Sequence, residues 1–271
     1  MKDLEYMIKH GDPKSFLRDK NFRKQPGLSY CSGCGHGLVI KKLGEVIDDL
    51  GIADKTTFVA CVGCGVFDYE YYNFDTVEAA HGRAPAVATG IKRARPDQIV
   101  ITKQGDGDLI AIGTAETVHA ANRNENISIF FVNNAIYGMT GGQMAPTSLI
   151  DQKTTTTPEG RKLKDGGPIG VCELLNSLGV LYTNDGKEFP GGPTYLERVA
   201  VYDANQVRRL ESAIRKALRI QMKGQGFSLV EILSPCPSNW KMTVQEALDY
   251  TRNDMTKVYP LGVFRDLEDK R

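Results

Sequence analysis

This chain lacks long apolar runs, an excess of one charge, internal repeats and low-complexity tracts. No stretch approaches the roughly 20 consecutive apolar residues that a membrane-spanning helix needs. The first ten residues are charged and contain no apolar core of the kind found in secretory signals. Lys and Arg number 34 against 33 Asp and Glu, which argues against nucleic acid or an acidic membrane as a partner. We therefore expect a cytoplasmic protein.

The chain does contain an ordinary globular composition and alternating strand and helix patterns. Its 271 residues, 41% of them hydrophobic, suffice for one large α/β domain or two small ones. We expect an N-terminal arm at 1–27, an α/β domain at 28–237, and a C-terminal extension at 238–271 that packs on this domain or on a partner. Apolar runs predict strands at 56–61, 98–102, 127–132, 195–201 and 227–233, and helical spacing predicts helices at 38–50, 84–95, 109–124, 171–178 and 204–223.

Two polar motifs follow neighbouring strands of this pattern. Gly105-Asp106-Gly107-Asp108 follows the strand at 98–102, and the pair at 133–134 follows the strand at 127–132. A helix between the two strands predicts a parallel βαβ unit, in which Asp106 and Asn134 lie side by side at the carboxyl edge of the sheet. Carboxylate and amide oxygens suit Mg²⁺, although each residue could also be an ordinary turn residue.

This pattern resembles the GDG…NN signature of thiamine diphosphate enzymes. The resemblance implies that Asp106, Asn134 and the carbonyl group of Ile136 hold Mg²⁺. It also implies a doubly wound, mostly parallel α/β domain of the diphosphate-binding type. The residues expected to contact the cofactor are Gly63, Cys64, Gly105, Asp106, Gly107, Asp108, Asn134, Ile136, Gly138, Met139 and Thr140.

Six cysteines in a chain without a secretory signal indicate metal or redox chemistry. Two Cys-x-x-Cys pairs, Cys31/Cys34 and Cys61/Cys64, would by spacing alone suggest a zinc ribbon. Cys61 falls inside a predicted strand, however, whereas Cys64 and Cys236 follow strands and should reach the edge that carries Asp106. We therefore expect Cys31, Cys34, Cys64 and Cys236 to converge around a [4Fe–4S] cluster, and Cys61 and Cys172 to be core residues.

Together the motifs closely resemble the β subunit of the 2-oxoacid:ferredoxin oxidoreductases. In that family, residues matching Cys31, Cys34, Cys64 and Cys236 ligate the cluster nearest thiamine diphosphate. His36 and His81 lie in matching motifs, and each is expected either to contact cofactor or substrate or merely to cap a helix. The matching segments are YCSGCGH (30–36), VGC (62–64), HGR (81–83), GDGDL (105–109), HAANRN (119–124), NNAIYGMTGGQ (133–143) and SPCP (234–237).

The resemblance implies an enzyme that converts a 2-oxoacid and coenzyme A to acyl-CoA, CO₂ and reduced ferredoxin. It also implies an α subunit that supplies the pyrimidine-side Glu, together with γ and ferredoxin-like δ subunits. Phe67 stands where relatives that accept dicarboxylic oxoacids can carry a basic residue. We therefore expect a branched-chain substrate such as 3-methyl-2-oxobutanoate, then 2-oxoglutarate, then pyruvate, because a buried second carboxylate without a cationic partner is costly.

Two other functions remain open from the sequence, namely a non-redox thiamine diphosphate enzyme and a zinc-binding scaffold protein. The segment at 143–169 is rich in Pro, Thr and Gly, and its length predicts either a functional lid or a surface loop. Within it, Thr147 and Ser148 are candidates for gating substrate or coenzyme A.

Overall fold

A computed structural model of the protein describes residues 29–268, so the predicted arm at 1–27 lies outside the described residues. The centre of the molecule is a seven-stranded sheet with the order β2-β1-β3-β4-β8-β7-β9. Every neighbouring pair is parallel except β7 and β9. The strands are β1 (Thr56–Ala60), β2 (Asp75–Glu78), β3 (Ile99–Gly105), β4 (Ser128–Asn133), β7 (Tyr195–Ala200), β8 (Ser228–Leu233) and β9 (Gly262–Asp266).

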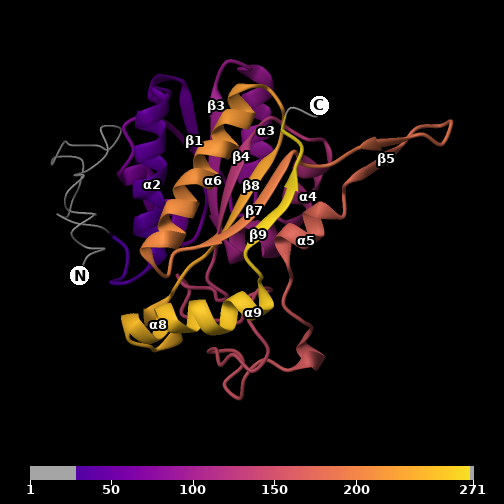
Figure 1. Ribbon diagram of the computed structural model, residues 1–271. Coiled ribbons are helices and arrows are strands. Elements are labelled where there is room, and N and C mark those ends of the chain that lie inside the picture. The colour runs from indigo at the N-terminus through magenta and orange to yellow at the C-terminus, as the bar shows by residue number, and fades with distance from the viewer. Residues whose placement is uncertain (1–28, 269–271) are drawn as a thin grey trace.

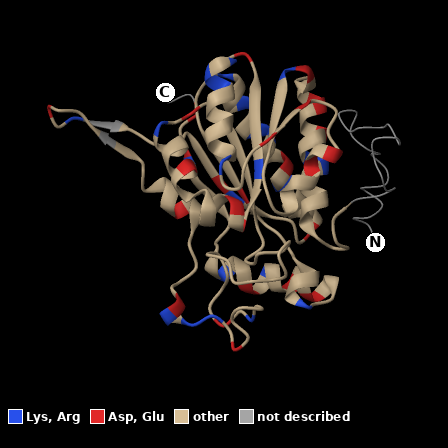
Figure 2. Ribbon diagram, turned by 180° about the vertical axis from the view of Figure 1, so that it is seen from behind, with Lys and Arg blue, Asp and Glu red and all other residues tan. Residues whose placement is uncertain are grey.

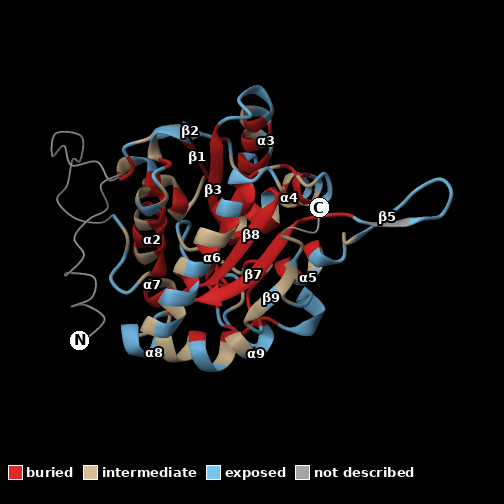
Figure 3. Ribbon diagram, turned by 45° about the horizontal axis from the view of Figure 1, so that its top comes forward, coloured by how far each residue is buried: buried red, intermediate tan, exposed pale blue. Residues whose placement is uncertain are grey.

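Helices cover both faces of the sheet, which confirms the predicted doubly wound, mostly parallel architecture (Figure 1). The helices α2 (Gly35–Leu50) and α6 (Ala204–Met222) pack on one face. The other face carries α3 (Ala84–Ala94), α4 (Thr114–Asn122) and α5 (Val171–Asn176). Successive side chains of β4 alternate between the two cores, with Phe130 in one and Phe131 in the other. The central strands are therefore buried throughout, as Figure 3 shows.

The helix predicted at 109–124 is split into two pieces. A π-helix, η3 (Gly107–Ile112), precedes α4, and Gly113 separates them. A Cβ atom on Gly113 would lie 2.4 Å from the carbonyl oxygen of Asp108 and 2.6 Å from that of Gly82. The predicted helix-like stretch is therefore present, but it consists of a π-helix and an α-helix that meet where Gly113 lies against Gly82.

Several elements were not predicted from the sequence. The strands β2 and β9 are short and partly exposed edge strands, and a hairpin of β5 (Val180–Tyr182) and β6 (Glu188–Pro190) projects from the body (Figure 1). Short helical segments are η1 (Ala53–Lys55), η2 (Cys64–Glu70) and η4 (Leu163–Asp165). The predicted extension at 238–271 supplies β9 to the central sheet, and its helical part comprises α7 (Pro237–Trp240), α8 (Val244–Tyr250), η5 (Thr251–Met255) and α9 (Thr256–Val258).

The C-terminal helical part packs on the loops that leave β4. Met255 and Tyr259 are buried against Ala135 and Leu149, and the Tyr259 hydroxyl donates to the carbonyl oxygen of Thr147 at 2.6 Å. Charged residues of both signs are interspersed over the helices (Figure 2). Within residues 29–268, no helix is both long and apolar enough to cross a membrane.

Candidate functional site

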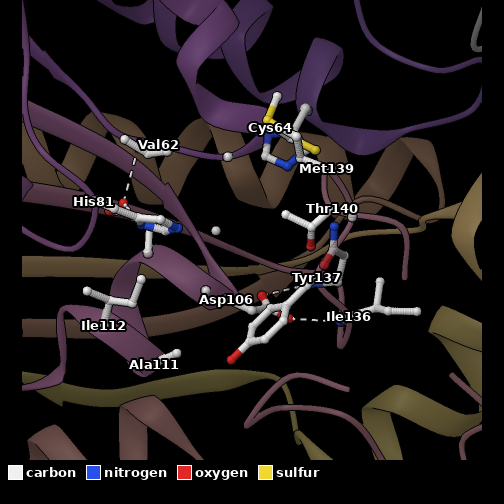
Figure 4. A pocket seen from close by; sticks show the side chains of 17 residues that line it. Val62, Cys64, His81, Asp106, Ala111, Ile112, Ile136, Tyr137, Met139 and Thr140 are labelled. Atoms are coloured by element: carbon white, nitrogen blue, oxygen red, sulfur yellow. Dashed lines mark hydrogen bonds and ion pairs between the residues drawn. The ribbon is translucent and has the colours of Figure 1, made fainter. Parts of the chain in front are cut away.

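A cavity of about 240 Å³ opens at the carboxyl edge of β1, β3 and β4. Figure 4 shows Asp106 and Tyr137 in its middle, with His81, Ala111 and Ile112 on one side and Cys64 and Met139 on another. The lining includes every residue predicted to bind the cofactor, and also His36 and His81. The structure therefore brings together residues that lie up to about a hundred positions apart in the chain.

Asp106 is a buried carboxylate with only uncharged hydrogen-bond donors. The backbone amides of Asn134 (3.3 Å) and Ile136 (3.1 Å) and the hydroxyl group of Thr147 (2.5 Å) donate to it. Burial raises the pKa of Asp106 to about 7, despite the opposing effect of these three donors. A cation beside it would favour the charged carboxylate, so this residue suits a metal ion.

Asn134 presents a buried polar atom without a partner. Its side-chain Oδ1 accepts no hydrogen bond within the described part of the chain, whereas its carbonyl oxygen accepts one from Trp240 Nε1 at 3.1 Å. An unpaired buried oxygen costs about 1–3 kcal/mol, and a hard cation would satisfy it. The carboxylate of Asp106 and this amide oxygen therefore fit the donor set expected for Mg²⁺.

The glycines of the cavity leave room where a diphosphate would lie. A Cβ atom on Gly105 or Gly63 would meet nothing within 4 Å, and Gly63 has a φ of +99°. Side chains at these positions would project into open space, so the two glycines expose backbone to a ligand. This arrangement fits the predicted approach of a diphosphate to the backbone.

Asp108 positions His81. One of its carboxylate oxygens is 2.7 Å from His81 Nδ1 and accepts from the backbone amides of Val62 (3.2 Å) and Gly82 (2.9 Å). The other oxygen accepts from Gln104 Nε2 at 2.6 Å. Asp108 therefore fixes two loops and one imidazole beside the cavity. His81 does not cap the helix that follows it, because the N-terminus of α3 has no side-chain cap.

His36 belongs to a buried polar network that the sequence analysis missed. Its Nδ1 lies 2.8 Å from Lys103 Nζ, and Lys103 in turn forms an ion pair with Asp68 at 3.1 Å. Tyr30 donates to the second oxygen of Asp68 and stacks on the His36 ring at 5.3 Å. Burial raises the pKa of Asp68 to about 6, while Lys103 opposes that rise.

The Lys103 contact determines the form of the His36 ring. A lysine ammonium group has donors only, so His36 Nδ1 must accept and the ring proton must lie on Nε2. Burial and the Lys103 charge both hold the pKa of His36 well below its usual value. His36 therefore remains a neutral imidazole with one N–H donor. It does not cap α2 either, because the N-terminus of this helix has no side-chain cap.

Four thiols lie within electrostatic reach of one another. Burial, together with the neighbouring Cys236, raises the pKa of Cys34 to about 12 and that of Cys64 to about 11. Cys31, which is exposed, raises the pKa of Cys64 and of Cys236. Among residues 29–268, no three His, Cys, Asp or Glu side chains lie as close as the ligands of one ion would. An iron–sulfur cube carries its four thiolates on four irons and does not require that closeness.

The remaining two cysteines are core residues. Cys61 and Cys172 have no exposed surface and belong to the apolar core on the α3 side of the sheet. The zinc-ribbon alternative requires Cys61 as a ligand, and the structure therefore disfavours it.

The segment at 143–169 is packed in its first part, whereas most residues from 155 to 169 are exposed. The buried guanidinium group of Arg161 donates to the carbonyl oxygens of five residues in and beside it (145, 146, 148, 166 and 167). Thr147 and Ser148 are fully buried, and Ser148 donates to the carbonyl oxygen of Ala135 at 2.6 Å. The hypothesis that these two residues gate substrate or coenzyme A stays a prediction. In the structure, Thr147 supports Asp106.

Sequence comparisons relate the chain to known enzymes. Residues 62–232 match the family described as "Thiamine pyrophosphate enzyme, C-terminal TPP binding domain". The ketoisovalerate oxidoreductase subunit VorA of Methanothermobacter thermautotrophicus is 47% identical over 238 residues, which are 88% of this chain and 47% of that relative. The 2-oxoglutarate synthase subunit KorB of Archaeoglobus fulgidus is 34% identical over 84% of this chain and 77% of its own length. The chain thus spans about half the length of the VorA relative.

A comparison of folds gives a consistent result. The structure of a 2-oxoglutarate:ferredoxin oxidoreductase from Magnetococcus marinus superposes with a TM-score of 0.68 at 24% identity. The match covers 94% of this chain and 88% of the other. It establishes a shared fold.

Proposed function

The chain belongs to the β-type subunits of the 2-oxoacid:ferredoxin oxidoreductases, a family of thiamine pyrophosphate enzymes, and from this premise we propose its reaction. The reaction is the oxidative decarboxylation of a 2-oxoacid with coenzyme A, giving acyl-CoA, CO₂ and reduced ferredoxin. The observation that carries the proposal is the unpaired Oδ1 of Asn134 beside the buried carboxylate of Asp106. These two atoms form a cation site at a glycine-lined cavity.

The residues of this site would hold Mg²⁺ and the diphosphate. Asp106, Asn134 and the carbonyl group of Ile136 are the proposed ligands of Mg²⁺, and Gly105 and Gly107 would lie against the diphosphate. When bound, thiamine diphosphate supplies the nucleophilic carbon and the electron sink for loss of CO₂. The protein contributes orientation and charge neutralisation.

The four converging thiols would hold a [4Fe–4S] cluster that accepts the electrons. Cys31, Cys34, Cys64 and Cys236 are its proposed ligands, and soft thiolates are what such clusters require. The buried cation of Lys103 lowers the pKa of Cys34 and of Cys64, opposing the larger effect of burial. This charge favours the thiolate form that ligation needs.

His36 and His81 would act on the substrate from two sides of the cavity. His36 can offer a single N–H donor, which suits a carboxylate or carbonyl oxygen of the 2-oxoacid. His81 is half-exposed and oriented by Asp108, so it can contact either cofactor or substrate.

We propose a branched-chain 2-oxoacid such as 3-methyl-2-oxobutanoate as the substrate. The described lining of the cavity contains no Lys or Arg, and the nearby Lys103 is paired with Asp68. A second carboxylate, as in 2-oxoglutarate, would lack a cation from this chain. The higher identity to a relative named for ketoisovalerate, 47% against 34% for one named for 2-oxoglutarate, also supports this choice.

The site needs partner chains to be complete. We propose that an α subunit supplies the pyrimidine-side Glu, and that γ and ferredoxin-like δ subunits join the complex. The relatives are themselves named as subunits, and this chain matches only 47% of the VorA relative.

A substrate panel on the anaerobically purified complex tests the proposal. We expect 3-methyl-2-oxobutanoate to give the highest kcat/KM for CoA-dependent ferredoxin reduction, ahead of 2-oxoglutarate and pyruvate. Fastest turnover of 2-oxoglutarate would overturn the substrate assignment alone. Absence of Mg²⁺-dependent thiamine diphosphate binding would overturn the function itself.

A further inference from the structure

Asn133, the first residue of the Asn pair, does not line the cavity although its neighbour Asn134 does. It is fully buried, and its side chain uses both ends of the amide. Nδ2 donates to Glu231 Oε1 at 2.8 Å, and Oδ1 accepts from the backbone amide of Ala135 at 3.1 Å. The orientation of the amide is unambiguous, because a carboxylate oxygen can only accept.

The contact with Ala135 holds an unfavourable backbone conformation. Ala135 has a φ of +57°, a left-handed conformation that residues other than glycine rarely adopt. Its carbonyl oxygen accepts from Ser148 Oγ at 2.6 Å and from Gln152 Nε2 at 2.8 Å. This turn directs the amides of Asn134 and Ile136 toward Asp106 and leaves Asn134 Oδ1 unpaired.

Glu231, which accepts the hydrogen bond from Asn133, is itself held in a buried ion pair. It lies on β8 in register with Phe131 of β4 and has no exposed surface. Its second oxygen is 2.9 Å from Arg198 Nε, and Arg198 also pairs with Glu173. A buried carboxylate held by a buried guanidinium group gives Asn133 an immobile acceptor.

We infer that Asn133 and Glu231 are positioning residues for the metal, which hold Ala135 in its left-handed turn and so aim Asn134 Oδ1 and the Ile136 carbonyl group at one cation. The inference rests on the proposed function, because it concerns how the proposed Mg²⁺ ligands are oriented. Glu231 orients the turn through Asn133 and also adds a negative charge near Asp106, and neither Asn133 nor Glu231 lines the cavity.

Trp240 provides a local reporter for the test. It is the only tryptophan of the chain, and its Nε1 donates to the carbonyl oxygen of Asn134 at 3.1 Å. The full chain is titrated with Mg²⁺ at a saturating concentration of thiamine diphosphate. Trp240 fluorescence is recorded, and equilibrium dialysis of thiamine diphosphate gives an independent value. We expect Asn133→Leu to raise the half-saturating Mg²⁺ concentration about tenfold to 100-fold, as loss of a group that orients a metal ligand typically does.

Asn126→Leu is the matched control. Asn126 precedes β4, whereas Asn133 ends it, and both of its amide atoms are also used, with Gln221 and Gly226. It should lose a similar number of hydrogen bonds at the opposite edge of the sheet. The Mg²⁺ requirement should then stay within about twofold of that of the wild type.

A second substitution keeps the inference testable if Asn133→Leu folds poorly. Glycine adopts positive φ without strain, so Asn133→Leu combined with Ala135→Gly should fold and recover most of the Mg²⁺ affinity. An unchanged Mg²⁺ requirement in Asn133→Leu, an equal loss in Asn126→Leu, or no recovery in the double variant would each overturn this inference alone. A wild type without Mg²⁺-dependent binding of thiamine diphosphate would overturn the proposed function as well.

Discussion

Asp106 and the backbone of the turn that carries Asn134 are held by more hydrogen bonds than the four thiols next to them. Asp106 accepts three hydrogen bonds. The turn at 133–136 is bound by side chains of Trp240, Ser148 and Gln152. Each of these contacts comes from the protein and requires no ligand.

The thiols have fewer contacts. Cys236 Sγ accepts from the side chain of Asn239 at 3.5 Å and from its backbone amide, Cys34 accepts from the backbone amide of His36, and Cys31 is exposed. Burial and mutual repulsion raise the pKa of Cys34 to about 12 and of Cys64 to about 11, so both are protonated near neutral pH. Formation of a cluster must therefore release protons and draw the thiolates into place.

This difference indicates that the fold alone orders the backbone around Asp106 and Asn134 more completely than it orders the four thiols. A hard cation at the proposed site would meet a backbone that is already fixed and would pair the free oxygen of Asn134. A cluster at the proposed thiol site would have to draw its ligands into place. Substitutions on the two sides should therefore be separable, which three experiments can test.

The largest expected effect is the loss of the cluster in Cys236→Ser. Iron, acid-labile sulfide and visible absorption should fall from roughly four iron and four sulfide per chain to near zero in anaerobic protein. Ferredoxin reduction should be lost with them. Mg²⁺-dependent binding of thiamine diphosphate should remain within a few-fold of the wild-type value, because the oxygen ligands do not depend on the thiols.

Cys172→Ala is the control, since Cys172 is fully buried in the core and should leave the iron content unchanged. A cluster that survives Cys236→Ser, or cofactor binding that fails together with it, would contradict the separation of the two sides.

The placement of Asp106 and Asn134 at one edge of the sheet could be predicted from the sequence because the signals for it are local. Apolar runs place β3 and β4 next to one another, and parallel strands put Asp106 and Asn134 at the same edge. Because the motif residues immediately follow these strands, their position needed no knowledge of long-range packing.

The network of Lys103, Asp68 and Tyr30 could not be predicted in the same way. The three residues come from β3, from η2 and from the segment before α2, so they meet only through long-range packing, and pairing of buried charges has no sequence period. A lysine inside the apolar strand at 99–105 was the one available signal. The edge strands β2 and β9 were missed because they are short and half-exposed.

His36 lines the cavity, and its replacement should have the second largest of the three expected effects. In the assembled complex, His36→Leu should lower kcat/KM for the 2-oxoacid by about 100-fold, a typical cost for removing one hydrogen-bond donor from a reacting oxygen. His36→Gln should recover most of this activity, because its amide can place an N–H close to the position of Nε2.

Iron content and Mg²⁺ affinity serve as controls for this pair of variants, and both should stay near the wild-type values. The proposed donor role would be refuted by equal activity of the Leu variant and the wild type. A Gln variant no better than the Leu variant would argue that His36 acts only by filling space.

The smallest effect concerns the stability of the cofactor-free protein, which should fall as the pH rises. Asp106 has a folded-state pKa of about 7 against its usual value of 3.8, so the folded state binds a proton where the unfolded state has lost it. The resulting loss is about 2 kcal/mol between about pH 5 and about pH 7. Urea unfolding at several pH values measures it, and Asp106→Asn should remove this part of the slope.

Asp68, with a pKa raised to about 6, contributes a slope of the same sign that Asp106→Asn leaves in place. Mg²⁺ with thiamine diphosphate should abolish the Asp106 part in the wild type, because a bound cation favours the charged carboxylate. No such ligand effect is expected in Asp106→Asn. If the wild-type slope were unaffected by Mg²⁺ and thiamine diphosphate while both bind, the cation would not be at Asp106. The proposal that Asp106 and Asn134 hold a cation would then be wrong.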